Sequence, residues 1–561
     1  MSDTIEIEFE GRRIAARAGE SLAAALAAHG ILTLRTTRGA AERGMFCGMG
    51  VCQDCLVEID GQPEQRACMT KVERPLQVRR QTHGRSLVPV AGGPPPVTSV
   101  DVAVERPELL VIGAGPGGLS AAIAARSAGA AVIVVDERSQ AGGQYFKQVS
   151  VAASGNAAPD HQHREGAALI ETARRLGVEI RAGVMVWGAF DPGGFAAVAE
   201  GRSYRFSPKA TIIATGAYER GWPVPGWTLP GVMTTGAAQT LWRTARRLPG
   251  RRVLIAGNGP LNLQLAAELI EGGAEVAAVV EAAPRPGPAK LGALCTMLAT
   301  APELVRDGIR YHLRRRSGNA EMLYGQVVAS VAKGEHGLIV QLGAAESSES
   351  VSHRRSFEVD VLCLGYGFEP SNELLRVLGC GHDLDPVRRQ LVTRRDDHGR
   401  TDVEGTYALG DCTGLGGARA ALAEGTIVGL SVAEDLGHAI DATRRRKAQA
   451  DLRRHRRFQR GLWDLYAAPP YSASRATADT VICRCEEVTF GQVEEAMSEN
   501  MASAGAIKRR TRLGMGRCQG RYCAPVLEAL LTERLGKERG EFTGFAPRVP
   551  VKPVPIGELA R

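Results

Sequence analysis

The chain has 561 residues, 44% of them hydrophobic, and a formal net charge of +8. Such a length is enough for several globular domains with packed cores. Much of the positive charge lies in two short runs, 444–447 and 453–457, which predict a solvated helical connector, and the chain lacks interleaved aromatic residues, so we expect no nucleic-acid partner.

No apolar run reaches the roughly 18 residues that a membrane span needs. The acidic, alternating opening MSDTIEIEFEG does not have the pattern of a secretory signal. We therefore expect a cytoplasmic protein without a membrane span, which can be membrane-associated only through an electron acceptor. In a reducing cytoplasm, twelve cysteines indicate metal or redox chemistry rather than a disulfide framework.

The first cysteine group lies in residues 45–68. Its members are Cys47, Cys52 and Cys55, spaced C-x4-C-x2-C, and then Cys68. This is the plant-type ferredoxin spacing, and four thiolates can hold one [2Fe–2S] cluster. Structural zinc is the alternative, although zinc modules usually pair their ligands as two short hooks. Short predicted strands around the group indicate a small β-rich domain at 1–88, which resembles the ferredoxin-like 2Fe–2S subunits of bacterial amino-acid dehydrogenases.

A proline- and glycine-rich linker, 89–105, precedes a predicted strand, turn, helix and strand that begin near residue 106. Gly113, Gly115 and Gly118 stand in G-x-G-x-x-G register, which allows a tight turn, close approach of a pyrophosphate and close helix–strand packing. The acidic pair Asp136 and Glu137 ends the next strand, where a ribose hydroxyl would be held. These features predict a dinucleotide-binding turn.

Two later segments favour FAD over NAD at this turn. One predicted strand ends in Thr215 and Gly216, and a second, almost two hundred residues further on, ends in Gly410 and Asp411. The pattern closely resembles the two-dinucleotide-binding flavoproteins, and the resemblance implies that these residues contact FAD. The GGQ segment matches the same family and implies that Gly143 and Gln144 lie near the flavin. An NAD-only Rossmann domain would not explain the distant Gly-Asp segment.

A second strand–turn–helix–strand unit, 241–345, is predicted between the two FAD-binding parts, 106–240 and 346–440. Gly257 and Gly259 are present, but Asn262 takes the third glycine position and would crowd the helix against the strand. Glu281 ends the next strand in a plausible ribose-binding place. Three outcomes stay open: the unit binds NAD(P), binds another adenine nucleotide, or is structural.

The C-terminal region contains a second group of four cysteines, which again could bind a metal or an iron–sulfur cluster. After the basic connector, 441–477, a domain at 478–535 places Cys483 and Cys485 in C-x-C spacing and Cys518 and Cys523 in C-x4-C spacing, and a tail follows at 536–561. The domain resembles the bacterioferritin-associated-ferredoxin (BFD) type of helical [2Fe–2S] domain, whose second pair is more often C-x2-C. We favour a cluster over zinc or an empty site. Single cysteines elsewhere are expected to be small buried hydrophobic side chains: Cys295, Cys363, Cys380 and Cys412.

The order of parts defines a multi-domain α/β fold class: a β-grasp-like 2Fe–2S ferredoxin domain, a two-dinucleotide-binding Rossmann-like core and a BFD-like domain. This order, together with the stretch 216–239, resembles the FAD-containing α subunits of hydrogen cyanide synthase, opine oxidase and hydroxyproline or proline dehydrogenase, fused to their small ferredoxin subunit. Sarcosine oxidase α subunits are similar at a greater distance. The resemblance implies that amine oxidation occurs on a partner, a D-amino-acid-oxidase-like β subunit with its own FAD.

We therefore expect the electron-transfer α subunit of a heteromeric dehydrogenase or oxidase acting on an amine, amino acid or opine. Electrons would pass through FAD and two 2Fe–2S clusters to a downstream acceptor. The alternatives are a self-sufficient NAD(P)H-dependent reductase and a structural scaffold subunit. No catalytic residue can be assigned: His161, His163 and His312 are candidates only by type and are expected on the surface. The sequence names neither the substrate nor the final acceptor.

Overall fold

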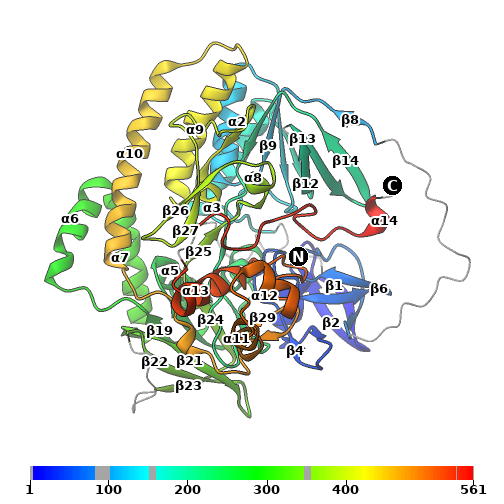
Figure 1. Ribbon diagram of the computed structural model, residues 1–561, viewed down its shortest axis with the longest axis vertical. Helices are drawn as coiled ribbons and strands as arrows, with labels where there is room; N and C mark the ends of the chain where they lie inside the picture. Colours follow the sequence, from blue (N-terminus) through cyan, green and yellow to red (C-terminus); the bar gives the residue numbers. More distant parts are fainter. Residues whose placement is uncertain are drawn as a thin grey trace, which may run out of the picture.

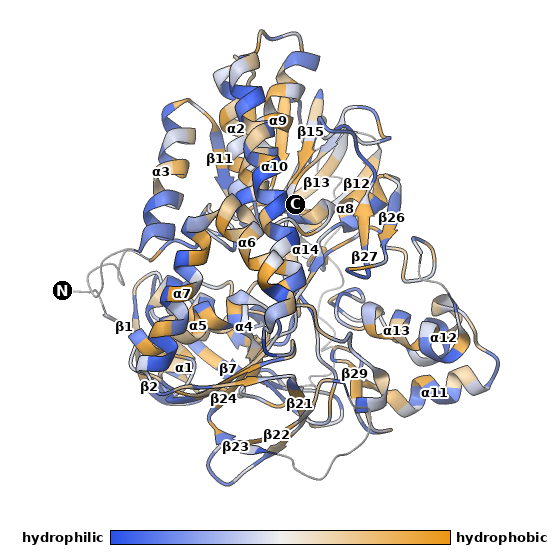
Figure 2. Cartoon of the chain, turned by 90° about the vertical axis from the view of Figure 1, so that its left-hand side faces the viewer, coloured by the Kyte–Doolittle hydropathy of each residue, from blue (hydrophilic) through white to orange (hydrophobic). Residues whose placement is uncertain are grey.

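The computed structural model describes residues 4–82, 102–150, 160–191, 193–346, 355–537 and 540–559. The Pro/Gly-rich segment 89–97 lies outside these ranges. Figure 1 shows the N-terminal domain beside the C-terminal helical domain, with the larger sheet-and-helix core above and beside them. Figure 2 shows that the most hydrophobic residues line the central strands and the helix faces turned toward them. No helix of the described ranges combines the length and apolar character that a bilayer crossing requires.

The N-terminal domain is a five-stranded sheet covered by one helix, α1 (Leu22–Ala28). Ser21 caps this helix by accepting a hydrogen bond from the N–H of Ala24, and five of its residues are buried against the sheet. The strand order is β2-β1-β7-β5-β6, with β1 and β7 parallel, so the predicted β-grasp-like fold is confirmed. The strands are β1 (Thr4–Phe9), β2 (Arg12–Arg17), β5 (Leu56–Ile59), β6 (Gln62–Arg66) and β7 (Gln77–Arg80), with a small pair β3 (Arg35–Thr36) and β4 (Glu42–Arg43).

The first dinucleotide unit has a five-stranded parallel sheet in the order β11-β10-β9-β15-β28. Its strands are β9 (Leu109–Ile112), β10 (Val132–Asp136), β11 (Glu179–Ala182), β15 (Ala210–Ile213) and β28 (Thr406–Ala408), and its helices are α2 (Pro116–Ser127), α3 (His161–Arg175) and α9 (Ala418–Asp435). A Cβ on Gly425 or Gly429 would stand 2.2 Å from a backbone oxygen of α2. Glycine there lets α9 press directly on α2.

A smaller sheet flanks this unit in the order β12-β13-β14-β8. It contains β8 (Val104–Glu105), β12 (Met185–Asp191), β13 (Gly194–Ala199) and β14 (Arg202–Phe206). Two short ribbons join the units, β16 (Ala217–Glu219) with β25 (Phe368–Pro370), and β26 (His382–Asp385) with β27 (Gln390–Thr393), next to helix α8 (Glu373–Val377).

The second dinucleotide unit is larger than predicted. Its parallel sheet has the order β17-β24-β18-β19-β20 and includes β17 (Val232–Thr234) and β24 (Val361–Gly365). Both strands lie outside the expected 241–345 span, so those two boundaries are wrong: short strands before and after the turn complete the sheet. The other elements are β18 (Arg252–Gly257), β19 (Glu275–Glu281), β20 (Glu321–Tyr324), β21 (Gln326–Lys333), β22 (Leu338–Ala344), β23 (Ser356–Val359), α4 (Thr235–Ala245), α5 (Pro260–Glu271), α6 (Leu291–Thr300) and α7 (Pro302–Ser317).

The basic connector is one long helix, α10 (Ala442–Leu465), as predicted. It is more than a spacer, because Ala448, Leu452 and Phe458 are buried and the helix packs against α9 and α6. The charged runs occupy its remaining faces.

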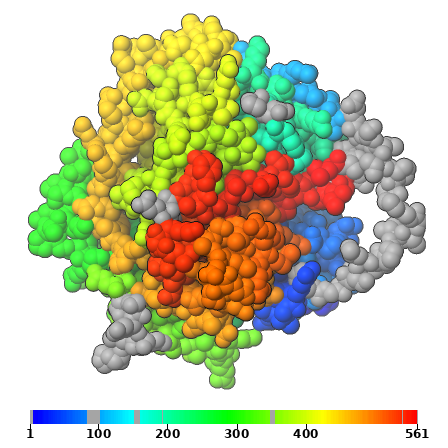
Figure 3. Space-filling model, viewed as in Figure 1, coloured from blue at the N-terminus to red at the C-terminus, as the bar shows by residue number. Residues whose placement is uncertain are grey.

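The C-terminal domain contains a strand pair, β29 (Val481–Cys483) and β30 (Val488–Thr489), and three helices, α11 (Phe490–Ser498), α12 (Ala504–Thr511) and α13 (Ala524–Leu535). The resemblance implied a helical domain here, and these elements agree with it. The tail then returns across the core, where the N–H of Val551 donates to the carbonyl of Trp187 at 2.8 Å, and ends in α14 (Ile556–Leu559). Figure 3 shows this red segment as a band between the FAD-type unit and the C-terminal domain.

Candidate redox site

The first glycine turn joins β9 to α2. Gly113 has φ +113°, and a Cβ on Gly118 would stand 1.9 Å from the Gly113 carbonyl oxygen, so only glycine lets the helix start this close to the strand. Gly115 precedes the first helical residue, and no side chain caps α2. The first N–H groups of the helix are therefore available to an anion such as a pyrophosphate.

The other predicted FAD residues gather at the same edge of the sheet. Thr215 and Gly216 follow β15 and Gly410 begins the short turn after β28, and the carboxyl ends of parallel neighbours share one edge. A Cβ on Gly143 would lie 2.8 Å from the Cα of Gly115, so the segment with Gly143 and Gln144 packs on the glycine turn. The structure brings these predicted residues together.

Two partly buried carboxylates hold the loops at this edge. Asp136 accepts from the N–H groups of Ala114 at 2.7 Å and Arg138 at 2.8 Å. Asp411 accepts from the N–H groups of Gly416 and Gly417 at 2.9 and 2.8 Å, just before α9. Burial raises the pKa of both carboxyl groups. Each carboxylate therefore organises a backbone loop where a dinucleotide would lie.

The second acid of the predicted pair, Glu137, has a different partner. Burial raises its pKa, but the ammonium group of Lys552, 2.5 Å away, brings the net shift below the ordinary value. Lys552 belongs to the returning tail, which the sequence did not connect with this region. Glu137 thus anchors the tail to the end of β10 while Asp136 organises the turn.

The residues at this edge fit an anionic dinucleotide. A Cβ on Gly216 would meet no atom within 4 Å, which leaves open space beside the strand end. Within the described ranges, the buried Nη1 of Arg138 has no hydrogen-bond partner. Open space, an unsatisfied cationic donor and a free helix N-terminus along the same edge suit a phosphate-containing cofactor.

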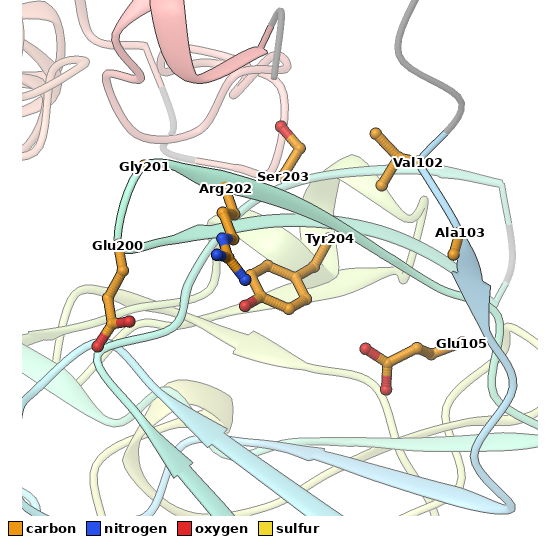
Figure 4. A pocket seen from close by; sticks show the side chains of 8 residues that line it. All are labelled: Val102, Ala103, Glu105, Glu200, Gly201, Arg202, Ser203 and Tyr204. Carbon is orange, nitrogen blue, oxygen red and sulfur yellow. The ribbon is translucent and has the colours of Figure 1, made fainter.

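Two hollows stand out in the described residues, and only the smaller touches this site. The larger, about 590 Å³, is lined by residues of β8, β14 and the turn before β14, and Figure 4 shows Glu105, Arg202 and Tyr204 among them. It contains none of the predicted site residues. The smaller, about 40 Å³, lies between the N-terminal domain and the segment that contains Gly143. Its lining includes Cys68, Arg138, Gly143 and Lys147.

A buried acid and a buried base lie near this turn and were missed from sequence. Burial lowers the pKa of Lys147 to about 7, and its ammonium donates to Gln239 Oε1 at 2.9 Å. Burial raises the pKa of Glu219 to about 7, and one of its oxygens accepts from the N–H of Gly236 at 2.8 Å. Lys147 stands in no motif, and Glu219 lies in the family-like stretch 216–239, which gave it no chemical role. Groups that titrate near neutrality beside a cofactor turn are candidates for proton handling.

The N-terminal cysteine sulfurs come together in two pairs. Burial raises the pKa of Cys47, but hydrogen bonds from Cys52 and from backbone N–H groups lower it to about 6. Cys68 is hydrogen-bonded to Cys55, which raises its pKa well above the ordinary value. Gly48 and Gly50 between the ligands have φ +62° and +78°, the left-handed conformation that the tight loop requires.

The C-terminal cysteines are arranged in the same way. Cys483 is hydrogen-bonded to Cys523, and Cys485 to Cys518. Within the described residues, no three metal-ligating side chains converge on a single-ion site. A [2Fe–2S] cluster takes two thiolates on each of two irons, whereas structural zinc takes all four around one ion. The two-by-two pairing fits the cluster at both sites.

The two cysteine groups and the FAD-type unit meet at an aromatic junction, which we define as Phe46, Tyr218, Trp227 and Tyr522. Phe46 precedes Cys47, Tyr522 precedes Cys523, and Tyr218 lies in β16 just after Gly216. The ring centre of Tyr522 is 5.3 Å from that of Phe46 and 6.0 Å from that of Tyr218. Parts of the chain that are far apart in sequence therefore touch at one point.

At the second glycine turn, side chains form hydrogen bonds that cross-link the turn to the neighbouring strands. Asn262 Oδ1 accepts from the Thr235 hydroxyl at 2.8 Å, and its Nδ2 donates to the Gly365 carbonyl at 3.2 Å. Glu281 accepts from the Asn258 side chain at 2.7 Å and from the Gly259 N–H at 3.0 Å. The predicted crowding is thus resolved by hydrogen bonds that tie α5 to the strand ends.

Three minor expectations need correction. His163 is buried rather than on the surface, because its ring lies 2.7 Å from Asp160 and its other nitrogen faces the Arg243 carbonyl. Cys295 is exposed, since α6 buries only Ala293 and Met297. His312 is half-buried, while His161 is exposed as expected.

Comparison with known proteins agrees with this arrangement. Residues 2–83 match the family described as 2Fe-2S iron-sulfur cluster binding domain, residues 107–425 match pyridine nucleotide-disulphide oxidoreductase, and residues 481–533 match BFD-like [2Fe-2S] binding domain. The chain is 32% identical to an opine oxidase subunit of Agrobacterium tumefaciens, over 81% of this chain and 91% of that protein. It is 29% identical to hydrogen cyanide synthase subunit HcnB of Pseudomonas aeruginosa, over 80% and 97%. The crystal structure of L-proline dehydrogenase from P. horikoshii has the same fold, with a TM-score of 0.72 at 21% identity, covering 100% of this chain and 98% of that one.

Proposed function

The chain belongs to the pyridine nucleotide-disulphide oxidoreductase family, among relatives that include opine oxidase subunits, and from this we propose that it is the electron-transfer subunit of a heteromeric enzyme that oxidises a CH–NH donor. It has an FAD-type oxidoreductase domain and two 2Fe–2S domains. The substrate class that we propose is an amine, an amino acid or an opine.

The observation that carries this proposal is the aromatic junction. Tyr218 of the FAD-type unit, Phe46 of the first cysteine loop and Tyr522 of the second lie within 6.0 Å of a neighbour, ring centre to ring centre. When bound, FAD exchanges two electrons with an organic substrate, whereas each cluster carries one. A chain whose three cofactor regions meet is suited to convert one kind of transfer into the other.

We assign the cofactor contacts as follows. The turn of Gly113, Gly115 and Gly118 binds the FAD pyrophosphate at the start of α2, and Asp136 lies at the ribose end. Asp411 orders the loop before α9 at the opposite end of the cofactor. The remaining contacts come from Gly143, Gln144, Thr215, Gly216 and Gly410. One cluster is held by Cys47, Cys52, Cys55 and Cys68, and the other by Cys483, Cys485, Cys518 and Cys523.

We further propose that the C–N bond is oxidised on a D-amino-acid-oxidase-like partner subunit with its own FAD, in the cytoplasm. The relatives are named as subunits, which supports an assembly. At the second glycine turn the Asn262 side chain donates to the Gly365 carbonyl at 3.2 Å, and the Tyr466 carbonyl accepts from the Asn258 side chain at 2.9 Å. These contacts favour a structural role for the second unit over productive NAD(P)H binding.

The cofactor content of the anaerobically purified chain tests this proposal. We expect one FAD and two irons for each cluster. Cys52→Ser should remove only the N-terminal cluster's electron paramagnetic resonance (EPR) signal, because its pair of thiolates is broken, while Cys363→Ser, in β24 and a member of neither cysteine group, should keep both signals. Stoichiometric zinc with little iron would contradict the two-cluster assignment.

A further inference from the structure

Each cysteine loop places one charged residue between two of its ligands, and these residues meet. Arg484 lies between Cys483 and Cys485, and Asp54 lies between Cys52 and Cys55. Arg484 Nε is 2.6 Å from Asp54 Oδ2, and the two side chains are only 2% and 0% exposed. A fully buried ion pair therefore joins the two loops.

The Arg484 side chain is held from several sides. Its Nη1 donates to the Trp227 carbonyl at 2.9 Å, and its guanidinium carbon lies 3.9 Å from the ring centre of Phe46 and 4.7 Å from that of Trp227. This guanidinium is thus fixed in the aromatic junction, where it has little freedom to turn toward solvent.

Asp54 is equally constrained, and the loops themselves touch. Its second oxygen accepts from Arg35 Nη2 at 2.8 Å, and Arg35 Nε donates to the Asp54 carbonyl at 3.2 Å. Cys485 Sγ lies 3.9 Å from the carbonyl oxygen of Cys52. A thiolate of one ligand set is therefore in contact with the backbone of the other.

A buried ion pair at this place needs an explanation beyond stability. Removing two charges from water costs about as much as their attraction returns, and packed hydrophobic residues would hold the domains together as well. The contact surface also carries Arg43, which pairs with Glu487 at 3.3 Å. Cations thus outnumber carboxylates among Arg35, Arg43, Arg484, Asp54 and Glu487. Such a surplus stabilises added negative charge on nearby ligands.

We propose that Arg484 and Asp54 form an electrostatic bridge that positions the two cysteine loops for direct electron transfer and couples the reduction potentials of the two clusters. The inference rests on the proposed function. In each transfer, one electron leaves the reduced cluster, which is oxidised, and enters the oxidised one, which is reduced; no bond or proton changes. The electrons come from FAD reduced by the CH–NH donor. Both residues are positioning residues.

The bridge predicts shifts of opposite sign for its two members. Asp54→Asn removes a negative charge that both loops face, so the reduced form of each cluster becomes easier to reach and both potentials rise. Arg484→Gln removes a positive charge and leaves Asp54 less neutralised, so both potentials fall. A merely structural role would give broadened or missing signals without this pattern.

The test is a potentiometric EPR titration of the full-length, cluster-loaded protein. The matched control is Arg534→Gln, which breaks an exposed ion pair with Glu494 in the C-terminal domain and should leave both potentials unchanged. Shifts of both signals, upward in Asp54→Asn and downward in Arg484→Gln, support the bridge. Shifts of one signal alone, or shifts of the same sign in the two variants, would overturn it.

The wild-type protein gives a second test that no folding defect can obscure. Reduced [2Fe–2S] clusters are paramagnetic, so two neighbouring ones should broaden or split each other's EPR lines at full reduction and not at half reduction. A fully reduced spectrum equal to the sum of two isolated signals would overturn the bridge while leaving the proposed function in place. Absence of the two cluster signals from the loaded wild-type chain would overturn the proposed function itself.

Discussion

The two glycine turns each join a strand to a helix, but they differ in the residue at the third glycine position. In the first, Gly118 lets α2 approach β9 so closely that a Cβ would stand 1.9 Å from a backbone oxygen, and the helix N-terminus stays open. In the second, Asn262 fills the corresponding position and bonds to Thr235 and Gly365. In the first turn the third position carries no side chain, whereas in the second it carries the Asn262 amide; among the described residues, both helices begin without a side-chain cap.

This difference shows that a strand–turn–helix unit can serve two purposes, binding a nucleotide or stabilising a sheet. Glycine at the third position favours close packing and leaves the pyrophosphate place free. An amide side chain there supplies cross-links between strands and helix, which stabilise the sheet whether or not a nucleotide binds. Substitutions at the two turns should therefore have different consequences for cofactor content and for stability.

The largest effect is expected from Gly118→Ala. The added Cβ would collide with the backbone at Gly113, so α2 must move away from β9. This movement would disrupt the proposed pyrophosphate-binding turn. We expect purified protein with little or no FAD and a lower Tm, measured by absorbance and thermal unfolding. Gly292→Ala in α6, where a Cβ meets no atom within 4 Å, is the matched control and should keep its FAD. Full FAD content in Gly118→Ala would refute the assignment of the first turn.

A smaller effect is expected from Asn262→Gly, which restores the usual glycine in the second turn. The variant loses two buried hydrogen bonds and gains a flexible helix residue, which together cost about 2–4 kcal/mol of unfolding free energy. FAD content should not change. Glu271→Ala, on an exposed position of the same helix, serves as the control. Unchanged stability on chemical denaturation would show that the Asn262 contacts are not structural.

The smallest effect is expected from Asp411→Ala. The N–H groups of Gly416 and Gly417 lose their acceptor, so the loop before α9 is less ordered and FAD is held about tenfold more weakly, or about 1.4 kcal/mol. Dilution and gel filtration followed by flavin fluorescence measure this loss. Asp397→Ala, an exposed acid nearby, should retain FAD. Equal retention in both variants would mean that the Gly-Asp segment does not contact the flavin.

Features that depend on local spacing could be predicted from the sequence. The turns at Gly113 and Gly257, the two cysteine groups and helices α11 and α13 each follow from residues close together in the chain. The extent of the second sheet could not, because β17 and β24 are short and pair across more than a hundred residues.

Contacts between residues far apart in the sequence could not be predicted either. Asp54 and Arg484 are 430 positions apart, and Glu137 and Lys552 are 415 apart. Each residue alone is an ordinary charge in its loop or tail. Only the packing of domains shows that the first pair joins the cysteine loops and that the second ties the tail to the FAD-type unit.

We propose that this chain receives electrons from a partner subunit rather than from NAD(P)H. The most direct test is to titrate the isolated, FAD- and iron-loaded chain with NADH and NADPH under anaerobic conditions while following the flavin absorbance. We expect no rapid bleaching with either nucleotide, because the contacts of Asn262 and of the Tyr466 carbonyl favour a structural role for the second turn. Rapid bleaching would contradict it and would identify the chain as a self-sufficient NAD(P)H-dependent reductase.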